Sequence, residues 1–255
     1  MIVAFAASAA FAGPAAAADM PARVKAPPLQ LYGWSGCYMG LNAGYGWGRN
    51  SFTDAIENAA SGAVFRFTDF DLTSNGWFGG SQIGCNVQWA EAVFGIETDF
   101  QAGNVKGNAL FPNAIFNFPS ATFNTAVTSE LRSFGTVRGR IGYSFAPWMM
   151  LYATGGFAYG EIQSSLSFPF AGGGANPFID FTRRTQYGYA AGGGWEALVT
   201  PRLSVKAEYL YVDLGARTHG FLIAGDVYGF SERMRMHTFK LGVNFLLPWA
   251  VVARD

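Results

Sequence analysis

From Trp34 onward, apolar side chains recur at every second position, which is the period of a β-strand. In the first segment, Leu41 and Trp47 lie on the apolar face, while Gly40 and Asn42 lie on the other. Seven further segments repeat the pattern. The eight segments span residues 37–47, 77–89, 92–101, 131–143, 149–160, 187–196, 203–211 and 238–245. The alternation therefore predicts eight strands that each bury one face.

The composition indicates a membrane protein that crosses with strands rather than helices. Hydrophobic residues make up 50% of the chain and charged residues 13%, against roughly 25% charged in ordinary soluble domains. After the first twenty residues, no apolar run approaches the roughly 18 residues that a membrane-spanning helix needs. Apolar residues interleaved with glycine and small polar residues are typical of a transmembrane barrel. The formal net charge is zero, so nothing suggests a nucleic-acid partner.

The connections between the predicted strands alternate in length. Short turns are expected at residues 90–91, near Pro147 and near Pro201, whereas long polar segments are expected at residues 49–75, 102–129, 163–186 and 215–234. Barrels of the bacterial outer membrane have short turns on the periplasmic side and long loops outside. This pattern predicts extracellular long loops and two periplasmic termini in a Gram-negative outer membrane.

The distribution of charge predicts which face of each strand meets lipid. Where a predicted strand carries several charges, they share one parity; these groups are Glu97 with Asp99, Arg132 with Arg138 and Arg140, and Lys206 with Glu208. A Lys or Arg facing lipid at mid-depth costs about 2–4 kcal/mol. We therefore expect the charges inside and the apolar faces outside, in an all-β, eight-stranded antiparallel up-and-down transmembrane barrel.

Aromatic residues mark the ends of the predicted strands, as interfacial girdles do. The outer belt is predicted to contain Tyr45, Trp47, Trp77, Tyr159, Tyr187 and Tyr211, and the inner belt Trp89, Tyr143 and Trp195. Upstream of the barrel (residues 34–255), residues 1–18 resemble a signal peptide that ends in an Ala-x-Ala site before Asp19. Residues 19–33 are predicted to be a flexible, proline-containing lead-in.

Several stretches resemble the OmpA-like small barrels, specifically the opacity-type, porin-like surface proteins of alphaproteobacteria. They are WSGCYMGLNAGYGW (34–47), GGSQIGCNVQ (79–88), GIETDFQ (95–101), FGTVRGRIGY (134–143) and VKAEYLYVDL (205–214). The resemblance implies an eight-stranded barrel and a surface antigen, an envelope-stabilising protein, a small porin or a haem binder. It also implies contact with the barrel assembly machinery, although Phe245 is followed by ten more residues instead of ending the chain.

The predicted lumen contains a balanced set of charges. Its members are Glu97, Asp99, Glu196 and Glu208 on the acidic side, and Arg138, Arg140, Lys206 and Lys240 on the basic side. An eight-stranded barrel is just wide enough for side chains to fill. We therefore expect a salt-bridged plug, with a constricted ion path as the alternative.

The two cysteines, Cys37 and Cys85, are predicted to lie at similar heights on the lipid faces of adjacent strands. The periplasm is oxidising, so a cross-strand disulfide is one interpretation. Two buried free thiols remain the other, because the sequence does not fix the strand register to one residue.

The chain offers no visible catalytic or metal-binding constellation. His219 and His237 are its only histidines, and neither is accompanied by a recognisable nucleophile and orienting acid. Two histidines and two cysteines give no metal spacing. We therefore expect neither an enzyme nor a metal or other cofactor.

The sequence thus predicts a structural, surface-exposed outer-membrane protein that contributes to envelope integrity, with membrane lipid and lipopolysaccharide as its surroundings. A narrow channel for ions or small solutes is one alternative. A loop-mediated adhesin or ligand (haem) binder is another. The oligomeric state cannot be read from the sequence.

Overall fold

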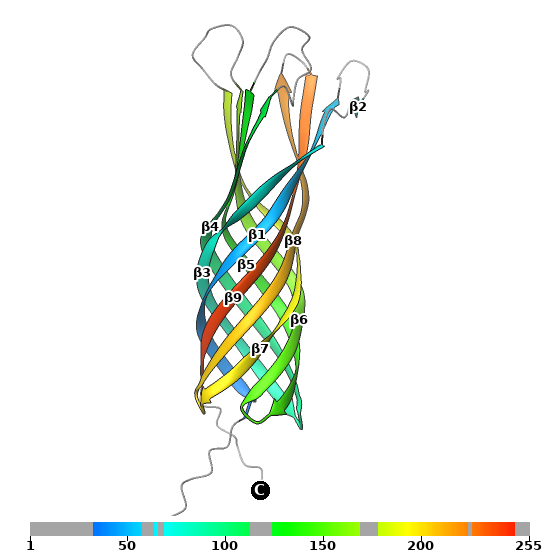
Figure 1. Ribbon diagram of the computed structural model, residues 1–255. Helices are drawn as coiled ribbons and strands as arrows, with labels where there is room; N and C mark the ends of the chain where they lie inside the picture. Colours follow the sequence, from blue (N-terminus) through cyan, green and yellow to red (C-terminus); the bar gives the residue numbers. More distant parts are fainter. Residues whose placement is uncertain are drawn as a thin grey trace, which may run out of the picture. The chain divides into compact units, whose positions relative to one another are not determined.

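The computed structural model describes residues 33–57, 64–65, 69–112, 124–168, 178–223 and 226–247. These residues form one sheet whose strands wind around a common axis (Figure 1). The strands are β1 (Gly36–Glu57), β2 (Val64–Phe65), β3 (Asp69–Trp89), β4 (Ala92–Pro112), β5 (Asn124–Ala146), β6 (Met149–Phe168), β7 (Phe178–Thr200), β8 (Leu203–Ile223) and β9 (Asp226–Leu246). The predicted signal peptide and most of the lead-in lie outside the described residues. Within those ranges there is no helix with the length and apolar character needed to cross a membrane.

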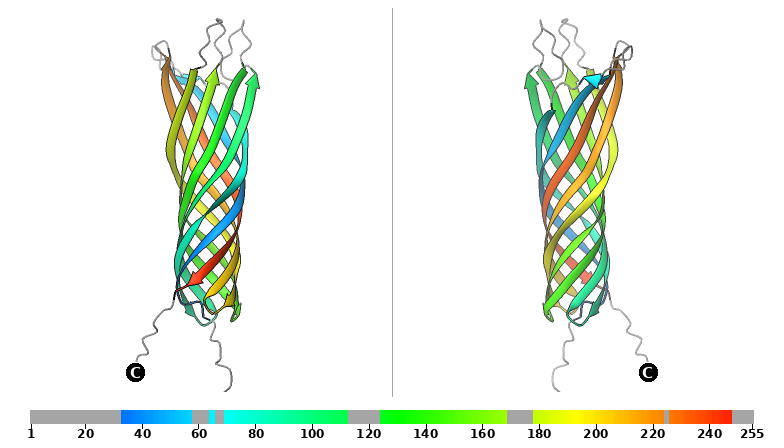
Figure 2. Two further views of the ribbon diagram at one scale, coloured as in Figure 1. Left: turned by 90° about the vertical axis from the view of Figure 1, so that its left-hand side faces the viewer. Right: turned by 90° about the vertical axis from the view of Figure 1, so that its right-hand side faces the viewer.

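The sheet closes on itself. Each long strand pairs antiparallel with the next one along the chain, and β1 also pairs with β9 from Tyr38↔Leu246 to Glu57↔Val227. The two-residue strand β2 only extends the end of β1. The predicted eight-stranded, antiparallel up-and-down barrel is therefore confirmed, and Figure 2 shows its strands from two sides.

Three two-residue turns join strands at the end of the barrel where β1 begins and β9 ends. They lie at residues 90–91, 147–148 and 201–202, as the sequence predicts. We call this the turn end, and we call the opposite end the far end. Ala90 adopts a φ of 54° in the first turn, a left-handed conformation that a tight turn requires.

The four segments predicted as long loops consist largely of strand. In the segment at residues 49–75, β1 continues to Glu57 and β3 begins at Asp69. The strands are 20 to 23 residues long, apart from β2, and a membrane requires only about 9–11. The sequence prediction ended the strands too early because the alternation weakens where neither face meets lipid, while the backbone ladder continues.

Exposed apolar side chains form a band around the turn-end half of the barrel. On β1 the band extends from Met39 to Trp47, and on β3 it extends from Trp77 to Trp89. Trp77 is 73% exposed and Trp89 is 80% exposed, as expected for rings at two membrane interfaces. We call this band the lipid band.

One charged residue predicted to face inward points outward instead. A register shift between Leu131 and Ser133 interrupts β5, so the strand changes phase there. Leu131 is buried in the lumen, whereas the side chain of Arg132 is 49% exposed on the outside. The prediction that Arg132 shares a face with Arg138 and Arg140 was therefore wrong, because a bulge cannot be read from parity.

Candidate functional site: the filled lumen

The lumen in the membrane-spanning half contains a network of ion pairs centred on Arg138. Its Nη2 atom lies 2.8 Å from Glu97 Oε1, 2.8 Å from Asp99 Oδ2 and 3.1 Å from Glu208 Oε1. Glu97 and Asp99 lie on β4, whose register pairs Glu97 with Arg138 on the neighbouring β5, whereas Glu208 on β8 meets Arg138 across the lumen. A guanidinium presents several donors in a fixed plane, so one arginine can contact several carboxylates here.

Two lysines complete this part of the network. Lys206 Nζ lies 2.8 and 2.7 Å from the two carboxylate oxygens of Glu97. Lys240 Nζ lies 2.6 Å from Asp99 Oδ2 and 2.9 Å from Glu208 Oε1. Each of these side chains is at most 2% exposed. Buried charges of this kind are tolerated when they are paired and hydrogen-bonded.

Arg140 and Glu196 extend the network toward the turn end. Arg140 Nη2 lies 2.7 Å from Glu196 Oε2, and Nη1 donates a hydrogen bond of 2.8 Å to the hydroxyl of Tyr38. The Tyr38 hydroxyl in turn donates to Glu97 Oε2 at 2.6 Å. The structure thus places all eight predicted lumen charges in one connected set.

Two tyrosines belong to the same set and were not singled out from the sequence. Tyr152 donates to Glu208 Oε2 at 2.8 Å, and the guanidinium of Arg140 lies 4.1 Å from the centroid of its ring. Tyr38 lies against Gly84, where an added Cβ would be 2.4 Å from the tyrosine hydroxyl. The signal that could have found both tyrosines was their position on the polar face of strands whose other aromatics face lipid.

The ion-pair network includes three neighbouring carboxylates that could in principle hold a metal. Oxygens of Glu97, Asp99 and Glu208 lie within 4.8 Å of one another. Arg138 Nη2 lies within 3.1 Å of all three carboxylates, and Lys240 Nζ lies within 2.9 Å of Asp99 and Glu208. The positive charge that the three carboxylates require is therefore supplied by the protein itself, and the arrangement does not fit a divalent cation.

An apolar layer closes the lumen at the turn end. Trp34 precedes β1 and is 2% exposed. Its indole N–H donates to Ser144 Oγ at 3.2 Å, and its backbone N–H donates to Gln88 Oε1 at 3.0 Å. Trp34 packs in one buried cluster with Val93, Met150, Tyr152 and Leu198. The segment before the first strand therefore contributes a side chain that covers this mouth of the barrel.

A second apolar layer fills the lumen from the edge of the lipid band toward the far end. It consists of Phe78, Val105, Leu131, Phe134, Ala158, Ile162, Ala190, Leu210, Val212, Leu214, Met234 and Met236. The alternation in the sequence predicted a lumen lined by polar and charged residues, and this layer was missed. Beyond it, Glu232 accepts hydrogen bonds from Ser129 and Ser164, both at 2.8 Å, and Phe52, Leu72 and Val127 form a further cluster.

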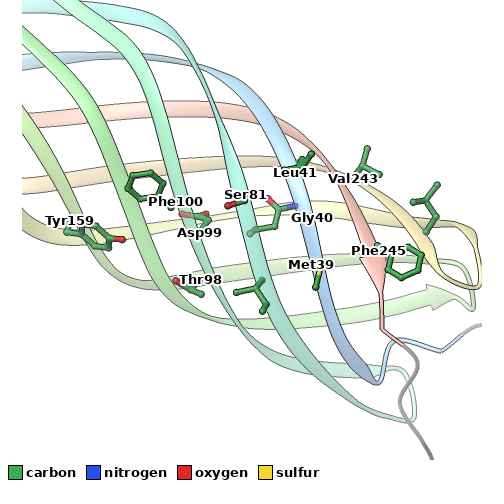
Figure 3. Close-up of a pocket in the computed structure, with 13 residues that line it drawn as sticks. Met39, Gly40, Leu41, Ser81, Thr98, Asp99, Phe100, Tyr159, Val243 and Phe245 are labelled. Carbon is green, nitrogen blue, oxygen red and sulfur yellow. The ribbon is translucent and has the colours of Figure 1, made fainter.

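The lipid face carries a shallow hollow of about 630 Å³. Figure 3 shows Met39 and Leu41 on β1 beside Val243 and Phe245 on β9. These four side chains are 46–71% exposed, so they are directed away from the lumen. Most of the hollow therefore belongs to the surface that acyl chains would cover, and Asp99 of the ion-pair network also lines it.

The two cysteines face each other across β1 and β3. The register pairs Cys37 with Cys85, and their sulfur atoms are bonded as a disulfide. Of the two histidines, His237 lies at the far edge of the lipid band, where its Nδ1 is 2.6 Å from the hydroxyl of Tyr209. The side chain of His219 lies outside those that the structure describes.

Closed antiparallel topology, a lipid band and a lumen filled with side chains define a transmembrane β-barrel. Residues 3–245 match the family described as outer membrane protein beta-barrel domain. The 31 kDa outer-membrane immunogenic protein of Brucella melitensis is 32% identical over 248 residues, which cover 93% of this chain and 95% of that protein. The chain therefore belongs to this family of outer-membrane β-barrel proteins.

Two further comparisons agree with this assignment. The 22 kDa outer membrane protein of Rhizobium leguminosarum bv. viciae is 26% identical over 221 residues, covering 86% of this chain and 81% of that protein. The solved structure of the outer membrane protease OmpT from Escherichia coli aligns with a TM-score of 0.50 and 9% identity, covering 82% of this chain and 97% of that one. At that identity the likeness extends to the fold alone. The family match and these relatives support the predicted resemblance to alphaproteobacterial surface barrels.

Proposed function

We propose that this protein is a structural, non-catalytic barrel of the outer membrane that contributes to envelope integrity and does not conduct. The observation that carries the proposal is the continuous filling of the lumen. Trp34 and its neighbours occupy the turn end, the ion-pair network occupies the middle, and the layer containing Phe134 occupies the region beyond. A lumen filled with side chains in this way is a property of small barrels that act as walls rather than pores.

We further propose that the turn end faces the periplasm and the far end faces the outside. The strands continue about ten residues past Trp47 and Trp77 with polar side chains on their outer surface. Such faces need water, and bacterial outer-membrane barrels have their long connections outside. The protein would then present a stem and its connecting segments at the cell surface.

Single-channel recording tests whether the lumen conducts. Residues 19–255 would be refolded into planar bilayers, with folding verified by the heat-dependent shift in gel mobility. We expect no steady open events from the native sequence, and none from Arg138→Gln or Arg140→Gln, because the apolar layers stay in place. Steady conductance that changes in either variant would instead support the narrow channel and overturn the filled-wall proposal.

A deletion strain tests the role in the envelope. Cells lacking the protein are expected to be more sensitive to detergent and to release more periplasmic enzyme, and the native gene should restore both properties. A gene carrying Arg132→Gln, which alters only an exposed side chain, is the matched control and should restore them equally. Cells whose envelope is unchanged by the deletion would contradict the structural role, even if the barrel proves silent in bilayers.

A further inference from the structure

A continuous row of aromatic rings marks the far edge of the lipid band on β1, β3, β8 and β9. Trp77 contacts Tyr45 with ring centroids 5.1 Å apart, and Trp47 stacks on His237 at 6.0 Å. Tyr211 lies 5.3 Å from the same histidine ring. Aromatic rings prefer the level of the lipid headgroups, so this row places the headgroup region on these strands.

Three arginines lie immediately beyond the aromatic row. Arg49 is two residues past Trp47 on β1, and Arg235 is two residues before His237 on β9. The register places Arg49 directly opposite Arg235 and Ser51 opposite Arg233. The side chains of Arg233 and Arg235 are 41% and 47% exposed, and Arg49 is also exposed. We call Arg49, Arg233 and Arg235 the arginine cluster.

One carboxylate partly neutralises the arginine cluster. Asp213 on β8 lies 2.6 Å from Arg233 Nη2 and 3.7 Å from Arg235 Nε. Burial opposes ionisation of Asp213, but the hydrogen bonds from Arg233 and from the backbone of Gly215 hold the pKa of its carboxyl below the usual range. A second carboxylate, Asp71, lies opposite Ser51 at the outer edge of the cluster. Among the described residues, Arg49 has no ion-pair partner.

This arrangement leaves two like charges directly opposite each other on paired strands. Such a pair destabilises a sheet unless an opposite charge lies nearby. Asp213 engages Arg233 and Arg235 rather than Arg49, so the Arg49–Arg235 pair lacks a shared anion. Guanidinium groups bind phosphate oxygens in a bidentate manner, and they are the preferred side chains for that chemistry.

We propose that the arginine cluster binds the phosphorylated headgroup of a lipid in the outer leaflet. The phosphate would lie between Arg49 and Arg235, with Arg233 beside it. The acyl chains would lie along the exposed apolar side chains below the aromatic row, which include Phe239, Leu41 and Val243. The inference rests on the proposed orientation, which puts the far end in the outer leaflet, and it adds a specific lipid contact to the structural role.

A second basic pair provides a matched control. Lys106 on β4 is paired with Asn75 on β3. Asn75 lies two residues beyond Trp77 toward the far end, so Lys106 lies at a similar height to the arginine cluster. Lys106 Nζ and Arg132 Nε lie 3.4 and 3.7 Å from Glu130 Oε1. Here the carboxylate lies between the two cations, so they already share an anion. Removing Lys106 and Arg132 deletes the same charge as removing Arg49 and Arg235 without touching the proposed site.

The test measures lipid binding to the refolded barrel in nanodiscs of phosphatidylcholine. The probe is bis-phosphorylated lipid A, and native mass spectrometry counts the lipid that stays bound to the protein. We expect R49Q/R235Q to lower the apparent affinity roughly thirtyfold, given the typical contribution of a basic residue near an anionic surface. K106Q/R132Q should change it less than about threefold, and lipid A without its phosphates should bind weakly to the native protein.

Three outcomes would overturn the proposal. Equal binding of lipid A by R49Q/R235Q and by the native protein would show that the arginine cluster does not bind the lipid. Equal losses in both double variants would indicate a general effect of net charge. Displacement of lipid A by millimolar inorganic phosphate would indicate an ion site rather than a lipid site. Because a nanodisc exposes both faces of the barrel, these results do not depend on orientation, and the conductance recordings test the wall function separately.

Discussion

The middle of the lumen and the region beyond it toward the far end are filled with different kinds of side chain. In the half surrounded by the lipid band, the wall is apolar outside and the lumen contains Arg138, Lys206 and their carboxylate partners. Toward the far end, the outer surface becomes polar and the lumen contains Leu131, Met234 and Met236. Each strand thus has an apolar outer face and a polar inner face in the lipid band, and the reverse arrangement, typical of a soluble protein, toward the far end.

The difference teaches what stabilises each half. Where the wall faces lipid, the outward apolar side chains leave water for acyl chains; this transfer favours insertion but does not select one packing, because lipid tails are as apolar as the side chains. The interior must then supply specificity through ion pairs and hydrogen bonds. Where the wall faces water, burying apolar side chains in the lumen is favourable, as in any soluble core. The two halves should therefore lose stability through different kinds of substitution.

The largest effect is expected at the centre of the ion-pair network. Arg138→Met keeps much of the side-chain volume but leaves Glu97, Asp99 and Glu208 without the guanidinium that pairs them. Breaking a buried pair in this way costs about 3–5 kcal/mol. The free energy of unfolding, measured by urea titration in lipid vesicles, should fall by that amount. Arg132→Met, on the exposed face of the same strand, should lower it by less than about 1 kcal/mol.

The next effect compares the outer surfaces of the two halves. Ile141 on β5 is 55% exposed within the lipid band, and Ile141→Arg places a charge in the hydrocarbon region at a cost of about 2–4 kcal/mol. Thr128 faces outward near the far end of the same strand. Thr128→Arg should change the free energy of unfolding by less than about 0.5 kcal/mol. Similar losses in both variants would show that the lipid band is placed wrongly on β5.

These contrasts also explain how much of the fold could be read from the sequence. The strands were predictable where lipid enforces the alternation of apolar and polar side chains, as between Met39 and Trp47. The inward orientation of the eight lumen charges was predictable for the same reason. The strand extensions and the apolar lumen were not predictable, because parity alone does not tell whether water or lipid faces a segment. Arg132 was misplaced because the bulge beside Leu131 leaves no signature in the spacing of apolar residues.

A smaller effect is expected in the far half of the lumen. Leu131→Ala removes a fully buried side chain, and we expect a loss of about 2–3 kcal/mol in the free energy of unfolding. The value lies low in the usual range because Met234 and Met236 share the cluster and can move into the space. Leu241 is 58% exposed in the lipid band. Leu241→Ala should cost less than Leu131→Ala, because acyl chains fill the space and no cavity adds to the lost transfer free energy. Equal costs would contradict the proposed difference between the two halves.

The smallest effect concerns the pairing of Cys37 with Cys85 at the turn end. A bond between them encloses a sequence separation of 48 residues, and it would stabilise the barrel by restricting the unfolded chain. The register of β1 on β3 is already fixed by pairing from Gly36↔Asn86 to Thr53↔Asp69. We therefore expect reduction to cost about 1–2 kcal/mol, in the lower part of the range for native disulfides.

Two measurements decide whether the disulfide forms in the cell and how much it contributes. The protein isolated from membranes would be unfolded and alkylated without reductant, and its mass should show no label on Cys37 or Cys85. Labelling of both would establish two free thiols and contradict the disulfide. If the bond is present, the reduced native protein and C37S/C85S should unfold at the same urea concentration. A larger loss in C37S/C85S than on reduction would mean that the cysteine side chains also stabilise the barrel through packing at the lipid face.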